Sequence, residues 1–480
     1  MSRAPDEKGR RAGELNQFGC SMTGYSFQVM DLAGPGLAVV VFGERDCASA
    51  FPRVSAEFAG HTRWNVYTVA LGENDVVAGL AEQRLRECLT AVAARMTDVG
   101  DAWPPVIEGH SLVRQPIDRD GVPVILVLST CLSEMTGADP APICREVSDA
   151  TGVKVIPVAT GGLRLRNQAE VVDTVGAVLI DAIGDRGDAD PRAVNLVGYQ
   201  TDAANDVASS DVMFRAEAAA IIKAMGGRMN SALPAGAVAA DWRRLPLGGL
   251  TFVSDSSIMR QVSAALESRG GRVIELLQPR GLAATDSFYK GIAAAIGTDP
   301  APILDSWPQR REAVQAIAEA RARFAGMRLA YGIGTIHNFR PDVLAMEGLA
   351  NLPFFLELGF DVEVVIQERD YPEVHQRIRR NLDALGVTVP YRLYYEPAVL
   401  EPAIRDGRFD CAYVADFMRD QVMRAGIPML RFGDMSSGYG FAGRYVRQIS
   451  RTLGGLFDRR YARYVRGADS SAEKGRGGHR

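Results

Sequence analysis

Three cysteines in the first third of the chain have a residue type and a setting suited to metal chemistry. Cys20 lies in the glycine-flanked segment NQFGCSMTG, Cys47 follows the apolar run AVVVFG, and Cys131 follows VPVILVLST. A thiolate is both a soft metal ligand and a nucleophile. Because Cys47 and Cys131 each follow a predicted strand, we expect them at the carboxyl edge of a sheet, where open α/β folds bind ligands.

The other three cysteines are interpreted as small buried hydrophobic residues. Cys88 lies in an amphipathic helical pattern, Cys144 in PAPICREV and Cys411 in the strand-like FDCAYVA. For the first three, spacing alone leaves a buried thiol and a metal ligand both open. A cubane iron–sulfur cluster normally takes four thiolates. Three thiolates in one chain therefore indicate a ligand from elsewhere, as in a cluster that bridges two subunits.

The elements that would carry these cysteines alternate between short β-branched runs and longer helical patterns. Strands are predicted at 37–42, 122–129, 153–158, 193–199, 250–254, 273–277, 327–331, 361–367, 391–395, 411–414 and 428–432, and helices at 81–96, 169–183, 216–225, 258–267, 310–324 and 443–456. Several strands are apolar throughout, as parallel strands with two covered faces must be. The predicted fold class is α/β, with three Rossmann-like doubly wound domains and parallel sheets.

Breaks in this alternation give the expected domain limits. The stretch GDRGDADP at 184–191 and the proline-rich 297–308 separate the blocks. We expect a disordered N-terminus over 1–14 and a first α/β domain with the candidate cysteines over 15–188. A second α/β domain is expected over 189–308, a third with the C-terminal helix over 309–465, and a disordered tail over 466–480.

Composition narrows the classes of partner. The 480 residues hold 54 Lys and Arg against 58 Asp and Glu, a net charge of −4, so the chain lacks the basic field of a general nucleic-acid binder. Its longest apolar runs are too short to span a bilayer, and its charged start does not resemble a secretory signal. We expect a cytoplasmic protein without nucleic-acid or membrane partners.

Common catalytic motifs are missing from the sequence. The segment GIGTIH at 332–337 lacks the third glycine of a dinucleotide loop, and no P-loop, C-x-x-C, H-x-x-x-H or G-x-S-x-G pattern occurs. Nucleotide hydrolysis is therefore expected in another protein. From the residues alone, a metal-free enzyme of Rossmann-type domains, such as a glycosyltransferase, stays open as an alternative.

Four strings in order, GCSMTG, FGERDCAS, GENDVVAGL and STCLSEMTGAD, resemble the N-terminal motifs of nitrogenase component 1 subunits. Further along, QPRGLAATDSF resembles the family's G-L-x-A-T-D-x-F segment, and SSGYGFAG resembles the start of its terminal helix. The resemblance covers about residues 15–458. It departs from the family where FGERDC replaces the HGPQGC type of turn.

The resemblance implies a β-like, electron-relay subunit with no catalytic residues of its own. The chain has no Cys between Cys144 and Cys411, and His375 is followed only by His479, so neither ligand of the family's catalytic cofactor is matched. Cys20, Cys47 and Cys131 would bind an 8Fe-7S cluster of the P-cluster type, shared with the partner subunit; a 4Fe-4S cluster stays open. Backbone N–H groups of Gly19, Gly24 and Gly43 are candidate donors to its sulfurs.

The resemblance also implies partners and an activity. The partners would be a homologous α-like catalytic subunit, in an α2β2 heterotetramer, and an ATP-dependent iron protein. The sequences of these motifs diverge from those of nitrogenases, which favours a nitrogenase-like reductase that cleaves C–S bonds, as methylthio-alkane reductases do. The β subunit of a nitrogenase proper and a cofactor-assembly scaffold are the alternatives within the family.

Overall fold

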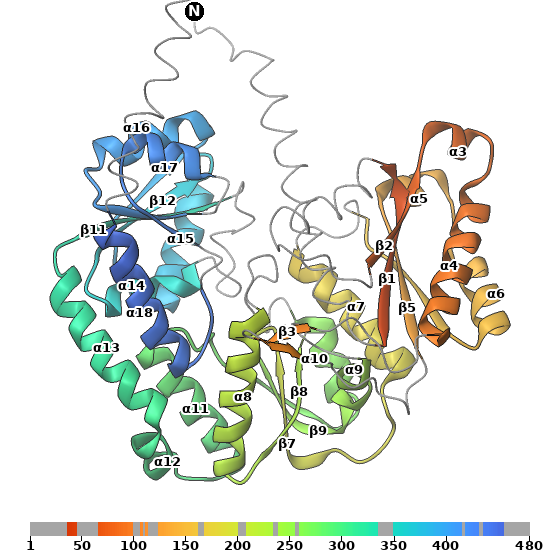
Figure 1. Cartoon of the computed structure of the whole chain (residues 1–480), viewed down its shortest axis with the longest axis horizontal. Helices are drawn as coiled ribbons and strands as arrows, with labels where there is room; N and C mark the ends of the chain where they lie inside the picture. The colour runs from red at the N-terminus through yellow and green to blue at the C-terminus, as the bar shows by residue number, and fades with distance from the viewer. Residues whose placement is uncertain are drawn as a thin grey trace, which may run out of the picture. The chain divides into compact units, whose positions relative to one another are not determined.

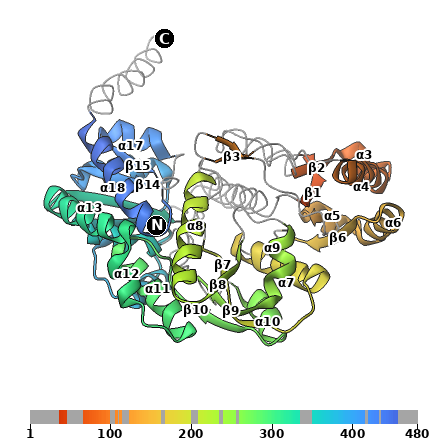
Figure 2. The ribbon, with the colours of Figure 1, turned by 60° about the horizontal axis from the view of Figure 1, so that its bottom comes forward.

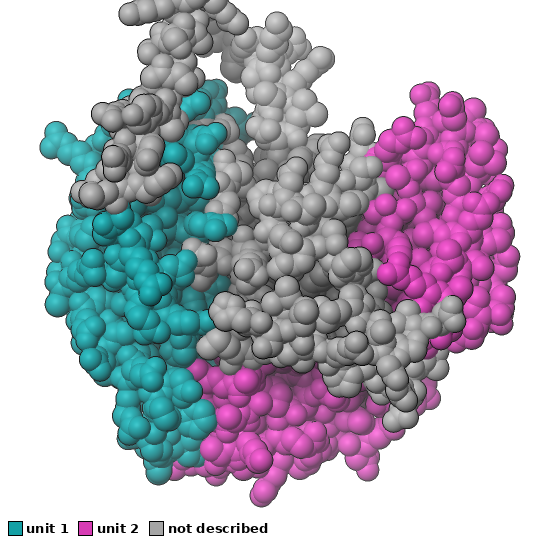
Figure 3. All heavy atoms as spheres, in the orientation of Figure 1, with its two compact units in different colours: residues 1–17, 277–290, 301–480 teal, residues 18–276, 291–300 magenta. Residues whose placement is uncertain are grey.

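The computed structural model describes most of the chain outside its two ends and several loops. The described residues are 36–45, 66–98, 106–108, 111–113, 123–161, 168–199, 208–233, 239–254, 259–334, 349–414, 418–431 and 435–455. Cys20, Cys47 and the two expected disordered ends lie outside them. Figure 3 colours two compact units: one of Met1–Gln17, Leu277–Lys290 and Ala301–Arg480, and one of Phe18–Leu276 and Gly291–Pro300.

The first sheet, in the unit that begins at Phe18, carries Cys131. Its strands are β1 (Leu37–Glu44), β2 (Val66–Leu71), β5 (Val124–Ser129) and β6 (Lys154–Ala159), all parallel in the order β2-β1-β5-β6. Helices α4 (Ala81–Asp98) and α6 (Ala141–Thr151) lie side by side over one face (Figure 1). The short helices α3 (Glu73–Val77) and α5 (Cys131–Thr136) follow β2 and β5. Both therefore lie at the carboxyl edge of the sheet.

The core of this domain explains why its strands are apolar on both faces. All six side chains of β5 are buried, as are the first seven residues of β1. Apolar residues of α4 and α6 pack on one face of the sheet, among them Leu85, Leu89 and Val147. Burial of this kind stabilises a domain by about 25 cal/mol for each Å² of apolar surface removed from water.

The second sheet belongs to the same unit and is also parallel. Its strands are β7 (Asp190–Val197), β8 (Arg228–Leu233), β9 (Gly248–Val253) and β10 (Arg272–Glu275), in the order β10-β9-β7-β8. Its helices are α8 (Ala208–Ala224), α9 (Ala239–Arg244) and α10 (Arg260–Glu267), with a 3-10 turn at Leu245–Leu247. Helix α7 (Gln168–Ile183) packs beside α9 and α10 (Figure 2), and Asp173 accepts hydrogen bonds from the first turn of α10. A small antiparallel pair, β3 (Val106–Glu108) and β4 (Ser111–Val113), completes this unit's strands among the described residues.

The third sheet belongs to the other unit and is parallel in the order β13-β12-β11-β14-β15. Its strands are β11 (Arg328–Gly334), β12 (Asp361–Gln367), β13 (Tyr391–Tyr394), β14 (Cys411–Val414) and β15 (Met429–Arg431). The remaining helices are α11 (Leu282–Ile296), α12 (Ala301–Ser306), α13 (Pro308–Phe324), α14 (Leu352–Glu357), α15 (Pro372–Ala384), α16 (Leu400–Asp406), α17 (Arg419–Ala425) and α18 (Tyr439–Gly454), with 3-10 turns at Leu349–Asn351 and Pro397–Val399. Stacked aromatic rings such as Phe324 and Phe360 fill its core.

The predicted fold class is confirmed, because the three larger sheets are parallel and helices connect their strands. The prediction missed β2 and β8. It also treated 297–308 as a break, whereas α12 and the first residue of α13 lie there. Among the described residues, no helix combines the length and the apolar character that a membrane span requires.

Candidate functional site at the carboxyl edge of the first sheet

Cys131 lies where the sequence predicted, at the end of a buried parallel strand. Strand β5 ends at Ser129, Thr130 has an extended backbone, and Cys131 is the first residue of α5. Cys131 forms no disulfide with another described residue, and it is partly exposed. Cys47, the second predicted strand-end ligand, follows β1 by three residues and lies outside the described part of the chain, as does Cys20.

The three remaining cysteines differ from Cys131 in environment. Cys144 and Cys411 are buried, and Cys88 packs partly buried against the core under α4. Burial raises the pKa of Cys88 to about 11 and that of Cys144 to about 12, and it also raises the pKa of Cys411. These thiols stay protonated near neutral pH, so they are poor metal ligands. Their prediction as buried hydrophobic residues is confirmed for Cys144 and Cys411 and fits the partly buried Cys88.

The ends of β1 and β5 are joined directly beside Cys131. The Thr130 N–H donates to the Phe42 carbonyl oxygen (2.9 Å), and the Thr130 hydroxyl donates to Glu44 Oε2 (3.1 Å). The hydroxyl makes no capping bond to α5. A Cβ atom on Gly43 would lie 1.8 Å from Thr130 Oγ1, a separation that real structures do not show. The Thr130 side chain therefore lies against the Cα of Gly43, and this glycine is required for steric reasons.

A second set of contacts joins the end of β1 to the start of α3. The Asp75 carboxylate accepts a hydrogen bond from the Gly72 N–H (2.8 Å) and pairs with Arg84 (2.7 Å). The Gly72 hydrogen bond lowers the pKa of Asp75 most, and the charges of Arg84 and Arg45 lower it further against the effect of desolvation. A Cβ on Gly72 would lie 3.1 Å from the Arg45 guanidinium, so Arg45 reaches over this glycine.

Three segments that resemble family motifs thus meet at one edge of the sheet. They are the FGERDC segment, through Glu44 and Arg45, the GENDVVAGL segment, through Asp75, and the STC segment, through Thr130. These segments are separated in the sequence and follow different strands. Parallel pairing of β2, β1 and β5 brings their carboxyl ends together.

Large apolar side chains are exposed at the same edge. Val77 at the end of α3 is 82% exposed, Met135 in α5 is 71% exposed, and Leu80 lies just beyond α3. Since β2 and β5 flank β1, the helices that carry these side chains begin about 10 Å apart. Where such side chains form one contiguous patch, they are typical of surfaces that contact another protein.

The arrangement fits one thiolate ligand of a shared cluster. The partly exposed Cys131 lies on a turn that is fixed by hydrogen bonds to a neighbouring strand. Within the described ranges, His, Cys, Asp and Glu side chains do not gather in threes as a metal site would require. A cluster bound to Cys131 would need ligands besides the described residues.

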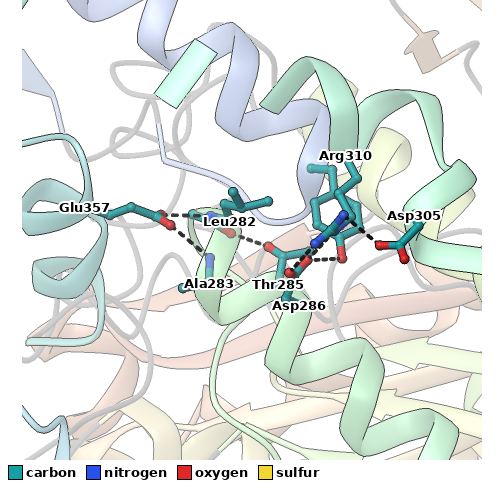
Figure 4. Close-up of polar contacts among 9 residues, drawn as sticks. Leu282, Ala283, Thr285, Asp286, Asp305, Arg310 and Glu357 are labelled. Atoms are coloured by element: carbon teal, nitrogen blue, oxygen red, sulfur yellow. Dashed lines mark hydrogen bonds and ion pairs between the residues drawn. The ribbon is translucent and has the colours of Figure 1, made fainter. Parts of the chain in front are cut away.

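The two later motifs meet in the other unit (Figure 4). Asp286, in the segment that resembles G-L-x-A-T-D-x-F, pairs with Arg310 through two hydrogen bonds of 2.8 and 2.9 Å. It also accepts a hydrogen bond from the hydroxyl of Tyr439, the first residue of α18 (2.7 Å). Glu357 accepts hydrogen bonds from the N–H groups of Leu282 and Ala283 at the start of α11. These contacts hold the starts of two helices in place and have no catalytic geometry.

The comparisons with known proteins agree with this fold. The family described as nitrogenase component 1 type oxidoreductase matches residues 111–453, which is more than two thirds of the 480 residues. The chain belongs to this family of oxidoreductases. The matched range includes Cys131 and begins after Cys20 and Cys47.

Two solved structures share the fold at low sequence identity. "Nitrogenase Cp1 at pH 6.5" is 15% identical with a TM-score of 0.66, and the alignment covers 90% of this chain and 92% of that chain. "Nitrogenase Cp1 at pH 5" is 12% identical with a TM-score of 0.60, and the alignment covers 90% and 88% of the two chains. Both have the fold of this chain over nearly its whole length.

Sequence reasoning missed the residues that fix the Cys131 turn. The role of Gly43 as a candidate backbone donor to sulfur stays a prediction, and the sequence did not indicate the close approach of Thr130 to this glycine. Glu44 and Thr130 are 86 residues apart, so no local pattern predicts their contact. The available signal was the departure from the family's turn, in which Glu44 and Arg45 stand where the HGPQGC type has proline and glutamine.

Proposed function

We propose that this chain is the β-like, electron-relay subunit of a nitrogenase-like reductase. Cys20, Cys47 and Cys131 would bind an iron–sulfur cluster of the P-cluster type at the interface with a homologous α-like subunit. The observation that carries the proposal is the position of Cys131, a partly exposed cysteine on the turn directly after β5, in a chain of the nitrogenase component 1 family.

The residues of this chain would bind, orient and shield the cluster. When bound, an iron–sulfur cluster transfers single electrons between a donor and an acceptor. The Thr130 and Gly43 contacts fix the direction of the turn that carries the Cys131 thiol. The catalytic metallocluster would lie in the α-like subunit of an α2β2 assembly.

The exposed apolar side chains favour this edge as the docking surface of the electron donor. Val77 and Met135 lie on the helices after β2 and β5, and Cys131 begins the second of these helices. Electron transfer requires a donor to approach the cluster closely, so an ATP-dependent iron protein would dock beside Cys131. Apolar contacts at such a surface would contribute through the area they bury.

Docking is tested by placing a charge on this surface. We expect Val77→Glu and Met135→Glu to slow ATP-dependent reduction of the complex by its iron protein at least tenfold, with iron content and reduction by dithionite unchanged. Val314→Glu is the matched control, because Val314 is 43% exposed on α13 in the other unit. Rates equal to those of the control would contradict this docking surface.

For the reaction, we propose reductive C–S cleavage of a methylthio-alkane. Two electrons and two protons convert R–S–CH3 into R–H and CH3SH, with the electrons supplied by the iron protein. The test supplies the anaerobically purified complex, its iron protein, MgATP and either a methylthio-alkane or dinitrogen. Methanethiol in step with ATP hydrolysis is expected. Ammonia without methanethiol would identify a nitrogenase proper, and no product with iron at or below about four per heterodimer would identify a scaffold.

A further inference from the structure

We propose that Glu44 is a positioning residue for the cluster, acting through Thr130. The two residues form a latch between the turn that leads to Cys47 and the turn that carries Cys131. The inference rests on the proposed function, because it assigns a role toward the cluster that those cysteines would bind. It adds residues that are not ligands and that were not predicted from the sequence.

The latch joins the ends of the two strands that precede Cys47 and Cys131 in the sequence. Glu44 is the last residue of β1, and Thr130 is the first residue beyond β5. The Thr130 side chain is buried, and its hydroxyl donates to Glu44 Oε2 at 3.1 Å. In the sequence, Cys47 follows Glu44 by three residues. Thr130 is bonded directly to Cys131.

The Thr130 hydroxyl is directed to a neighbouring strand. In an N-cap position a threonine hydroxyl ordinarily accepts from the first turn of the helix, and here it makes no such bond. It points instead toward Glu44, while Gly43 leaves room for its Cβ and Cγ2. The contact therefore joins two strands at the expense of capping α5.

Arg45, the residue after Glu44, lies close to the start of α3. Its guanidinium reaches over Gly72 and acts on the Asp75 carboxylate, which Arg84 also contacts. The end of β1 is therefore joined to β5 through Glu44, and Arg45, the next residue, lies close to α3. Two of the charged residues that replace the family's usual turn thus have partners at the neighbouring strand ends.

The test uses pairs of variants that keep or remove the hydrogen bond. Thr130→Val and Glu44→Ala remove it. Thr130→Ser keeps the hydroxyl, and Glu44→Gln keeps an acceptor oxygen while it removes the charge. Each full-length chain is purified anaerobically with its α-like partner, and iron per heterodimer, the electron paramagnetic resonance spectrum and the rate of iron loss to a chelator are measured. Circular dichroism monitors folding.

The proposal expects the two removing variants to lose iron to the chelator about tenfold faster than wild type, which equals about 1.4 kcal/mol, with a broadened spectrum. The two conserving variants should lie within about twofold of wild type. Removing and conserving variants with equal iron-loss rates, in a wild type that holds iron, would overturn the latch and leave the proposed function standing. If Thr130→Val does not fold, the Glu44 variants decide the test. The iron-loss rates of Glu44→Ala and Glu44→Gln must then still differ.

Failure of the proposed function has a different signature. A wild-type complex without iron, or one whose iron is unaffected by Cys131→Ala, would overturn the cluster assignment and the latch with it. An unchanged Cys131→Ala variant is distinguishable from an unchanged Thr130→Val variant because only the first removes a ligand.

Discussion

Replacing Gly43 by alanine tests the steric argument at the site most sharply. The added Cβ would lie 1.8, 2.4 and 2.5 Å from Oγ1, Cγ2 and Cβ of Thr130. Thr130 has little freedom to retreat, because it is β-branched and its N–H is bonded to the Phe42 carbonyl. Overpacking of this kind costs about 3 kcal/mol, and the alanine recovers up to about 1 kcal/mol through the unfolded chain. The net loss is about 2 kcal/mol.

The assay is native-state hydrogen exchange on peptides that cover β1 and β5, because it reports local free energies in a chain of several domains. A loss of about 2 kcal/mol corresponds to exchange about thirtyfold faster. All three clashing atoms belong to the Thr130 side chain, so in a Thr130→Gly background the same alanine should cost less than about 0.5 kcal/mol. Gly443→Ala, where the nearest atom lies at 3.7 Å, is the control. An equal cost of the alanine in both backgrounds would refute the reasoning.

The remaining predictions concern thiols and pH. In the cluster-free chain, an alkylating reagent should modify Cys131 at least a hundredfold faster than Cys144. The reason is that Cys144 is buried, which raises its pKa to about 12. Equal rates of modification, measured by mass spectrometry, would contradict the assignment of Cys144 as a core residue. Desolvation raises the pKa of Asp286, but hydrogen bonds from Arg310 and Tyr439 outweigh it, so the pKa lies below its usual value. The pair therefore stabilises the fold above about pH 4 and loses this effect as pH falls through the lowered pKa. Asp286→Asn should cost about 2 kcal/mol in hydrogen exchange of α11 and α18 at pH 7 and clearly less near pH 3, and the same cost at both values would disprove the linkage.

Much of the fold could be predicted because buried parallel strands have a strong sequence signal. The runs at 37–42, 361–367 and 411–414 are rich in apolar residues, many of them valine or isoleucine, and strands occupy these places in the structure. Strand β2 escaped prediction because VYTVAL lies next to an acidic segment and has several half-buried positions. Strand β8, RMNSAL, contains Asn230 and Ser231, whose side chains hydrogen-bond within the buried interior.

The candidate site was predictable in part for the same reason. The position of Cys131 follows from the buried strand before it and the helical pattern after it, and both are local features. The contacts of Thr130 with Gly43 and Glu44 depend on the pairing of β1 with β5, which brings together residues far apart in the chain. Local patterns hold no information about such pairs. The sequence shows that the charged segment FGERDC differs from the family's HGPQGC type of turn. It does not show which residues Glu44 and Arg45 contact.

The measurement that tests the central claim most directly is iron and sulfide analysis of the anaerobically purified complex of this chain with its α-like partner. Wild type, Cys47→Ala, Cys131→Ala and the control Cys144→Ala are compared. We predict iron well above eight per heterodimer in wild type and in the control, and a partial loss of iron and sulfide in each of the other two variants. A colourless wild type, or iron that is unchanged in both Cys47→Ala and Cys131→Ala, would contradict the account of a relay cluster bound at this edge of the sheet.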